Sequence, residues 1–234
     1  FGSALNYYNK GQYRNALKLF KKVETRYSFS DLAQRATLMI TYIYYQNSDY
    51  FNTLKFARKF QTLYPKNENI AYIDFLIAMT FYEQVQIVAR DQTYTKAALK
   101  EFKNIIGKYP NSKYAKESKL KIDLIDEQLA GKHMYLARFY MKKSKWISAI
   151  RRLNIILEDY PETIYTIETL HRLVEIYYKL GNISLAKKYA ATLGYNFNDS
   201  DWYKKTYKVV VDQNYESDTK KTKIKLRDKI KNIF

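Results

Sequence analysis

The chain has 234 residues, no cysteine and a formal net charge of +18 at neutral pH. The lack of cysteine excludes disulfides, thiolate metal ligands and cysteine nucleophiles within this sequence. Hydrophobic residues make up 47% of the chain, and with only 6 glycines and 3 prolines the composition favours an all-helical protein with a sizeable core. No run of about 20 apolar residues is present, so the sequence predicts no membrane-spanning helix.

A repeated spacing organises the chain from its first residues onward. A small residue is followed by a bulky one four positions later and another three later, which places all three on one face of a helix. This frame occurs at Ala16/Phe20/Val23, Thr53/Ala57/Phe60, Ala98/Phe102/Ile105 and Ala149/Leu153/Ile156, with alanine instead of a bulky residue at position 57. The last three frames end at Tyr64-Pro65, Tyr109-Pro110 and Tyr160-Pro161, where proline is expected to stop the helix.

The intervals between frames indicate helical hairpins. Ala16 and Thr53 are 37 residues apart, as are Ala149 and Ala186, which is close to the period of about 34 residues in tetratricopeptide (TPR) units. The middle intervals are longer, and the segment 112–141 is expected to form one long helix. We therefore predict a TPR-type helical-hairpin solenoid of five repeats, at about 1–28, 29–66, 67–111, 112–161 and 162–197.

The end of the chain departs from the repeat frame. Asp199-Ser200-Asp201 precedes Trp202 and predicts a capped final helix that covers the last repeat. The solenoid with its capping helix is expected to occupy residues 1–210. Residues 211–234 are expected to form a basic tail that is flexible or partly helical.

The positive charge raises the question of a nucleic acid or another anionic partner. Lysines are scattered over most of the predicted helices instead of forming one stripe, so the sequence favours no nucleic-acid role. A basic solenoid that binds RNA or anionic membrane surfaces stays as the weaker alternative.

Residues suited to catalysis are sparse. His133 and His171 lie far apart and have no metal-ligand partner at a useful helical spacing, and no glycine-rich phosphate loop is present. We expect no enzyme, no catalytic site, no bound metal and no cofactor.

Three groups of residues are candidates for binding. Tyr42, Tyr44 and Tyr45, with Tyr7 and Tyr8, place amphipathic rings where stacked helices would form a groove, although most tyrosines are expected to pack between repeats. A polar break holds Arg90 and Asp91, which could equally well cap the next helix or contact a partner. Arg151 and Arg152 lie on one helix, where a guanidinium can point outward to a carboxylate of a partner.

Beyond the generic repeat, the ordered set of motifs resembles the BamD family of outer-membrane assembly lipoproteins. The resemblance spans about residues 4–203 and rests on Tyr27-Ser28-Phe29-Ser30, Ala33-Gln34, Tyr42-Ile43-Tyr44-Tyr45, Leu63-Tyr64-Pro65, Arg90-Asp91-Gln92-Thr93, Tyr109-Pro110-Asn111-Ser112-Lys113-Tyr114-Ala115, Ala137-Arg138-Phe139-Tyr140, Ala149-Ile150-Arg151-Arg152 and Tyr160-Pro161-Glu162-Thr163. Ser28 stands where the family usually has proline after tyrosine.

The resemblance implies a non-catalytic scaffold of the β-barrel assembly machine, at the periplasmic side of the bacterial outer membrane. Its partners would be the POTRA region of BamA, other subunits of the machine and unfolded outer-membrane proteins. A lipid on a cysteine upstream of Phe1 would provide the anchor. By carry-over, client segments would bind at Phe29, Gln34, Tyr42 and Tyr44, whereas Arg152 and Arg151 would face BamA. The main alternative is a generic TPR adaptor of another complex.

Overall fold

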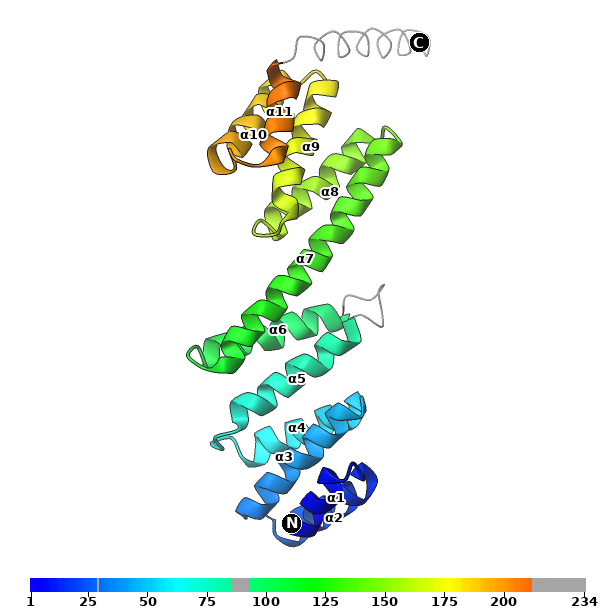
Figure 1. Ribbon diagram of the computed structural model, residues 1–234, viewed down its shortest axis with the longest axis vertical. Helices are drawn as coiled ribbons and strands as arrows, with labels where there is room; N and C mark the ends of the chain where they lie inside the picture. The colour runs from blue at the N-terminus through cyan, green and yellow to red at the C-terminus, as the bar shows by residue number, and fades with distance from the viewer. Residues whose placement is uncertain (29, 86–92, 212–234) are drawn as a thin grey trace. The chain divides into compact units, whose positions relative to one another are not determined.

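The computed structural model describes residues 1–28, 30–85 and 93–211, and within these ranges the chain folds entirely into α-helices and turns (Figure 1). The helices are α1 (Gly2–Asn9), α2 (Tyr13–Arg26), α3 (Asp31–Gln46), α4 (Tyr50–Leu63), α5 (Ile70–Val85), α6 (Thr93–Lys108), α7 (Lys113–Lys142), α8 (Trp146–Asp159), α9 (Tyr165–Lys179), α10 (Ile183–Asn196) and α11 (Asp201–Val211). They follow one another as packed pairs, so the predicted class of TPR-like helical hairpins is confirmed.

Two compact units divide the chain, Phe1–Ile125 and the part from Asp126 onward. The boundary between the units falls within α7. Helix α7 itself matches the long helix predicted over 112–141. The finer repeat boundaries given above stay predictions. The two units are described separately below.

The small-to-bulky frame lies at the centre of each hairpin. Ala16 and Phe20 are fully buried in the first hairpin, as are Ala98 and Phe102 in the third. In the second unit, Leu153 of α8 packs with α7 and α9 in one apolar cluster. A small residue at the first position lets two helices approach, and the bulky residues after it fill the space between them.

Each tyrosine-proline pair marks the end of the second helix of a hairpin. Helix α4 ends at Leu63, α6 at Lys108 and α8 at Asp159, in each case one residue before the tyrosine. The following proline offers no backbone N–H and disfavours helical geometry in the residue before it.

The turn inside each hairpin also repeats. Gly11, Ser48, Ser144 and Gly181 all have positive φ angles, between 55° and 75°, and each lies five residues before the small residue of its frame. A left-handed residue reverses the chain between two antiparallel helices, and glycine adopts it without steric cost. In the third hairpin the residue at this position, Thr93, is already the first residue of α6, and residues 86–92 lie outside the described residues.

Helix α11 covers the last hairpin, as the sequence predicts. Ser200 caps it by accepting a 3.1 Å hydrogen bond from the backbone N–H of Tyr203. Thr206 of α11 is buried and its hydroxyl lies 2.8 Å from Nδ1 of His171 on α9. This polar contact fixes α11 against the hairpin that it covers.

Candidate functional site

A ladder of four tyrosines runs through the first unit, with one ring from the first helix of each successive hairpin. We call Tyr8, Tyr42, Tyr72 and Tyr114 the tyrosine ladder. Neighbouring ring centroids are 6.4 Å apart from Tyr8 to Tyr42, 6.4 Å from Tyr42 to Tyr72 and 5.7 Å from Tyr72 to Tyr114. All four residues are half-buried, so each is partly accessible to solvent. These are tilted contacts within the favourable range for aromatic pairs.

Two hydroxyl groups of the ladder, those of Tyr8 and Tyr72, have raised pKa values. Burial, followed by the neighbouring Tyr42 and Tyr13, raises the pKa of Tyr8, and burial with Tyr42 and Tyr114 nearby raises the pKa of Tyr72 further. Gln46 joins the first two rungs, because it accepts a 3.4 Å hydrogen bond from the Tyr8 hydroxyl and donates a 3.2 Å bond to that of Tyr42. The ladder therefore combines apolar ring area with hydroxyl groups that can donate hydrogen bonds at neutral pH.

The residues expected to bind clients do not form one cluster. Tyr42 is a rung of the ladder. Tyr44 stacks on Phe56 with centroids 5.6 Å apart, and its hydroxyl accepts a 2.6 Å hydrogen bond from Lys21. Residues two apart on a helix point to different sides, so Tyr44 contributes to the packing of α2, α3 and α4 instead of the ladder.

The remaining predicted positions have separate surroundings. Gln34, near the start of α3, accepts a 2.5 Å hydrogen bond from Asn67 in the turn before α5. Phe29, Arg90 and Asp91 lie outside the described residues. In the second unit Arg151 is exposed on α8, and Arg152 is half-buried. Burial and the nearby charge of Arg152 lower the pKa of His133.

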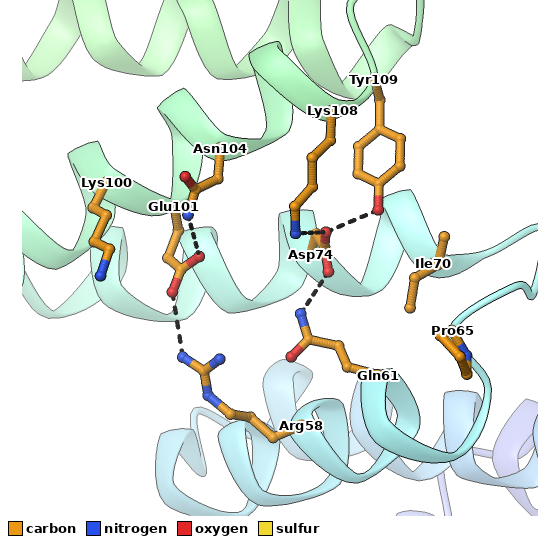
Figure 2. A pocket seen from close by; sticks show the side chains of 10 residues that line it. All are labelled: Arg58, Gln61, Pro65, Ile70, Asp74, Lys100, Glu101, Asn104, Lys108 and Tyr109. Carbon is orange, nitrogen blue, oxygen red and sulfur yellow. Dashed lines mark hydrogen bonds and ion pairs between the residues drawn. The ribbon is translucent and has the colours of Figure 1, made fainter.

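A polar pocket of about 590 Å³ opens between α4, α5 and α6 (Figure 2). Its base is Asp74 of α5, which is 6% exposed. Gln61 donates a 2.6 Å hydrogen bond to one carboxylate oxygen, and Tyr109 donates a 3.0 Å bond to the other. Lys108 forms an ion pair with Asp74 at 3.7 Å.

The rim of this pocket carries both basic and acidic side chains. Arg58 of α4 pairs with Glu101 of α6 at 3.2 Å. Figure 2 shows Lys100, the residue before Glu101 on α6, at the same rim. The buried carboxylate of Asp74 is already satisfied by two hydrogen-bond donors, Gln61 and Tyr109, and by the ion pair with Lys108. The pocket acts as a polar joint between the second and third hairpins.

The second unit contains a second buried carboxylate, Glu168 of α9, which is 5% exposed. Two guanidinium nitrogens of Arg138 on α7 donate hydrogen bonds to this carboxylate, and Arg172 donates a 3.1 Å hydrogen bond to it. Burial alone would raise the pKa of Glu168, but the hydrogen bonds and charges of Arg138 and Arg172 hold this pKa below its ordinary value.

Sequence reasoning found only part of these surfaces. The rungs Tyr42, Tyr72 and Tyr114 are 30 and 42 residues apart, so no fixed period connects them. The signal for Asp74 was available, since it is the one acidic residue before Glu83 in the otherwise apolar stretch of α5. Within the described residues, no group of His, Cys, Asp or Glu is arranged to hold a metal ion, and no helix is long and apolar enough to cross a membrane.

These features define the class of the protein: an all-helical repeat protein whose hairpins present aromatic and polar surfaces. The family model for YfiO, described as an outer membrane lipoprotein, matches residues 1–193. The chain belongs to this family.

Curated relatives agree with this assignment. The outer membrane protein assembly factor BamD of Rickettsia prowazekii is 37% identical over 209 residues, which cover 89% of this chain and 82% of the relative. The factor of the same name from Caulobacter vibrioides is 35% identical over 204 residues, covering 87% and 67%. Among solved structures, the apo form of RapI covers 94% of this chain and 60% of its own with a TM-score of 0.38 and 16% identity, which is too distant to support an argument.

Proposed function

We propose that the chain is a non-catalytic scaffold in outer-membrane protein assembly, which binds unfolded outer-membrane proteins and the POTRA region of BamA. The names of its relatives support the assembly role. The proposal places the protein at the periplasmic side of the outer membrane, held there by a lipid on a residue upstream of Phe1. Its partners would be proteins, and no cofactor would be required.

The observation that carries the client-binding part is the tyrosine ladder. Four half-buried rings follow one another along the first helices of the first unit, and their contacts hold them in place before any ligand arrives. Rigid tyrosines lose little conformational entropy on binding, and their ring and hydroxyl suit segments with both apolar and polar groups. An extended segment with a terminal aromatic residue would stack on Tyr8 and Tyr42.

A peptide titration tests this part of the proposal. A labelled peptide that ends in phenylalanine should bind the full chain, and Tyr42→Ala should weaken binding about three- to tenfold, the value of one aromatic pair. Tyr195→Ala is the matched control, because Tyr195 is an 89% exposed tyrosine of the second unit. Equal affinity of the Tyr42→Ala variant and the unaltered chain would remove the ladder from the client site.

The BamA contact is proposed at Arg152, with Arg151 beside it. Arg152 is half-buried and Arg151 is exposed on α8, and a guanidinium that reaches solvent there can form a bidentate pair with a carboxylate of a partner. Arg152→Glu should therefore weaken the complex with the isolated POTRA region, measured by calorimetry, whereas Lys187→Glu on α10 should not. An unchanged affinity would exclude Arg152 from this interface while leaving the client site untouched.

A further inference from the structure

Charge is segregated between the two helices of each hairpin in the first unit. The second helices α2, α4 and α6 carry twelve basic and two acidic residues, whereas the first helices α1, α3 and α5 carry one basic and three acidic residues. Lysines that look scattered along the sequence thus belong mostly to the second helices of the unit. Figure 1 shows that first and second helices alternate along this unit.

The two acidic residues of the second helices are used in ion pairs between hairpins. Glu24 of α2 is buried and pairs with Lys59 of α4. Glu101 of α6 pairs with Arg58 of α4 at 3.2 Å. These pairs join α2 to α4 and α4 to α6, so the three helices form one continuous surface, which we call the basic face.

Most cations of the basic face point to solvent. Lys18 and Lys22 on α2, Lys55 on α4 and Lys100 on α6 are all exposed. On α4 they lie beside an unusual apolar neighbour, since Phe51 is 78% exposed and precedes Lys55 by one helical turn. An exposed aromatic ring next to lysines is the combination found on surfaces that lie at a membrane interface.

We infer that the basic face of the first unit binds the anionic headgroups of a phospholipid surface, with Phe51 at the level of the headgroups. The cations are spread over three helices and do not converge on one point, which suits a diffuse layer of phosphates. An acidic protein segment fits less well. Two cations of the pocket between α4 and α6, Arg58 and Lys108, are already paired with Glu101 and Asp74.

This inference goes beyond the proposed function and does not depend on it, because the tyrosine ladder lies on the first helices. The experiment uses the full chain and vesicles of phosphatidylcholine, with or without phosphatidylglycerol. The face variant carries Lys18→Glu, Lys22→Glu, Lys55→Glu and Lys100→Glu. The control variant carries Lys132→Glu, Lys143→Glu, Lys187→Glu and Lys188→Glu, all exposed in the second unit, so both variants have the same net charge and the same C-terminal residues.

Cosedimentation should show binding of the unaltered chain to the phosphatidylglycerol vesicles only, and this binding should weaken as salt is raised. The face variant should partition about a thousandfold less, given about 1 kcal/mol for each basic residue at an anionic surface, and the control variant should change less than about fivefold. Equal losses in both variants, or no loss in the face variant, would overturn the inference. So would tighter binding to polyglutamate than to vesicles, because that result would indicate an acidic protein partner.

A second measurement covers the case in which the face variant does not fold. Phe51→Trp should show a blue shift of tryptophan fluorescence with phosphatidylglycerol vesicles, relative to the unaltered chain with Trp146 and Trp202. Tyr195→Trp places the same reporter on the second unit and should show none. A blue shift in the Tyr195→Trp variant alone would show that a different surface meets the lipid.

Discussion

The hydroxyl of Tyr109 donates a 3.0 Å hydrogen bond to Oδ2 of Asp74, and thereby ties the residue that follows α6 to a buried carboxylate of α5. The tyrosine of a tyrosine-proline pair therefore does more than mark the end of a helix. It satisfies a polar group inside the packed hairpins. The same carboxylate also holds Gln61 of the preceding hairpin, so Asp74 joins two repeats.

Removal of Asp74 should destabilise the protein strongly. Asp74→Ala leaves the donors of Gln61 and Tyr109 without their acceptor and should cost about 2 to 3 kcal/mol in urea unfolding. Tyr109→Phe removes one hydrogen bond and should cost about 1 kcal/mol. The double variant should lose less unfolding free energy than the sum of the losses in the two single variants. The control Tyr195→Phe should leave the unfolding free energy unchanged. Strict additivity would show that the two residues do not interact.

Alkaline pH should weaken the same joint. Burial and then the nearby Asp74 carboxylate raise the pKa of Tyr109 to about 12, whereas an unfolded tyrosine titrates near 10. The stabilising contribution is complete below about pH 10 and is lost as the pH rises toward about 12, because only the unfolded chain releases the proton in that range. Urea midpoints measured across this range should therefore fall less steeply for Tyr109→Phe than for the unaltered chain.

The carboxylate of Glu168 should matter more than an exposed one. Glu168→Gln leaves Arg138 and Arg172 without their buried anion and should cost about 3 kcal/mol. Glu101→Gln breaks the pair with Arg58, whose side chain is 56% exposed, and should cost less than about 1 kcal/mol. Chemical denaturation of both variants compares the two sites directly, and equal costs would contradict the buried ion cluster.

Acid should destabilise the second unit in two steps. Burial lowers the pKa of His171, so stability is complete above about pH 6.5 and falls as the pH drops and the unfolded imidazole takes up a proton. The lowered pKa of Glu168 adds a further loss below about pH 4. The ring centroids of Trp202 and His171 are 5.0 Å apart, so the fluorescence of Trp202 can follow the unfolding around His171. His133, whose pKa is also lowered by burial, contributes to the first step, so His171→Gln should reduce that step and leave the second.

Glycine substitutions should separate three kinds of position. Gly107→Ala in α6 meets nothing within 4 Å and should stabilise by about 0.5 to 1 kcal/mol, because alanine favours the helix. Gly131→Ala should lose this gain, since its Cβ would lie 2.9 Å from the Tyr165 hydroxyl. Gly11→Ala should destabilise by about 1 kcal/mol, because φ at this turn is +71°. Thermal unfolding gives the order of the three, and a stabilised Gly11→Ala would contradict the turn geometry.

The sequence alone determined the helical class, the hairpin frame and the ends of the second helices. Ala16/Phe20 and the tyrosine-proline pairs act through local spacing and backbone sterics, which do not depend on distant parts of the chain. The same local logic correctly predicted the long α7 and the capped α11.

Only the tertiary structure decided which side chains meet. Tyr42 and Tyr44 look equivalent in the sequence, yet Tyr42 joins the ladder with Tyr8 and Tyr72, while Tyr44 packs on Phe56. Lysines of α2, α4 and α6 belong to one basic face of the first unit, because ion pairs join these three helices to one another. Contacts between hairpins join residues 30 to 40 positions apart, such as Lys59 and Glu24, and the packing of helices selects these pairs where no local pattern can.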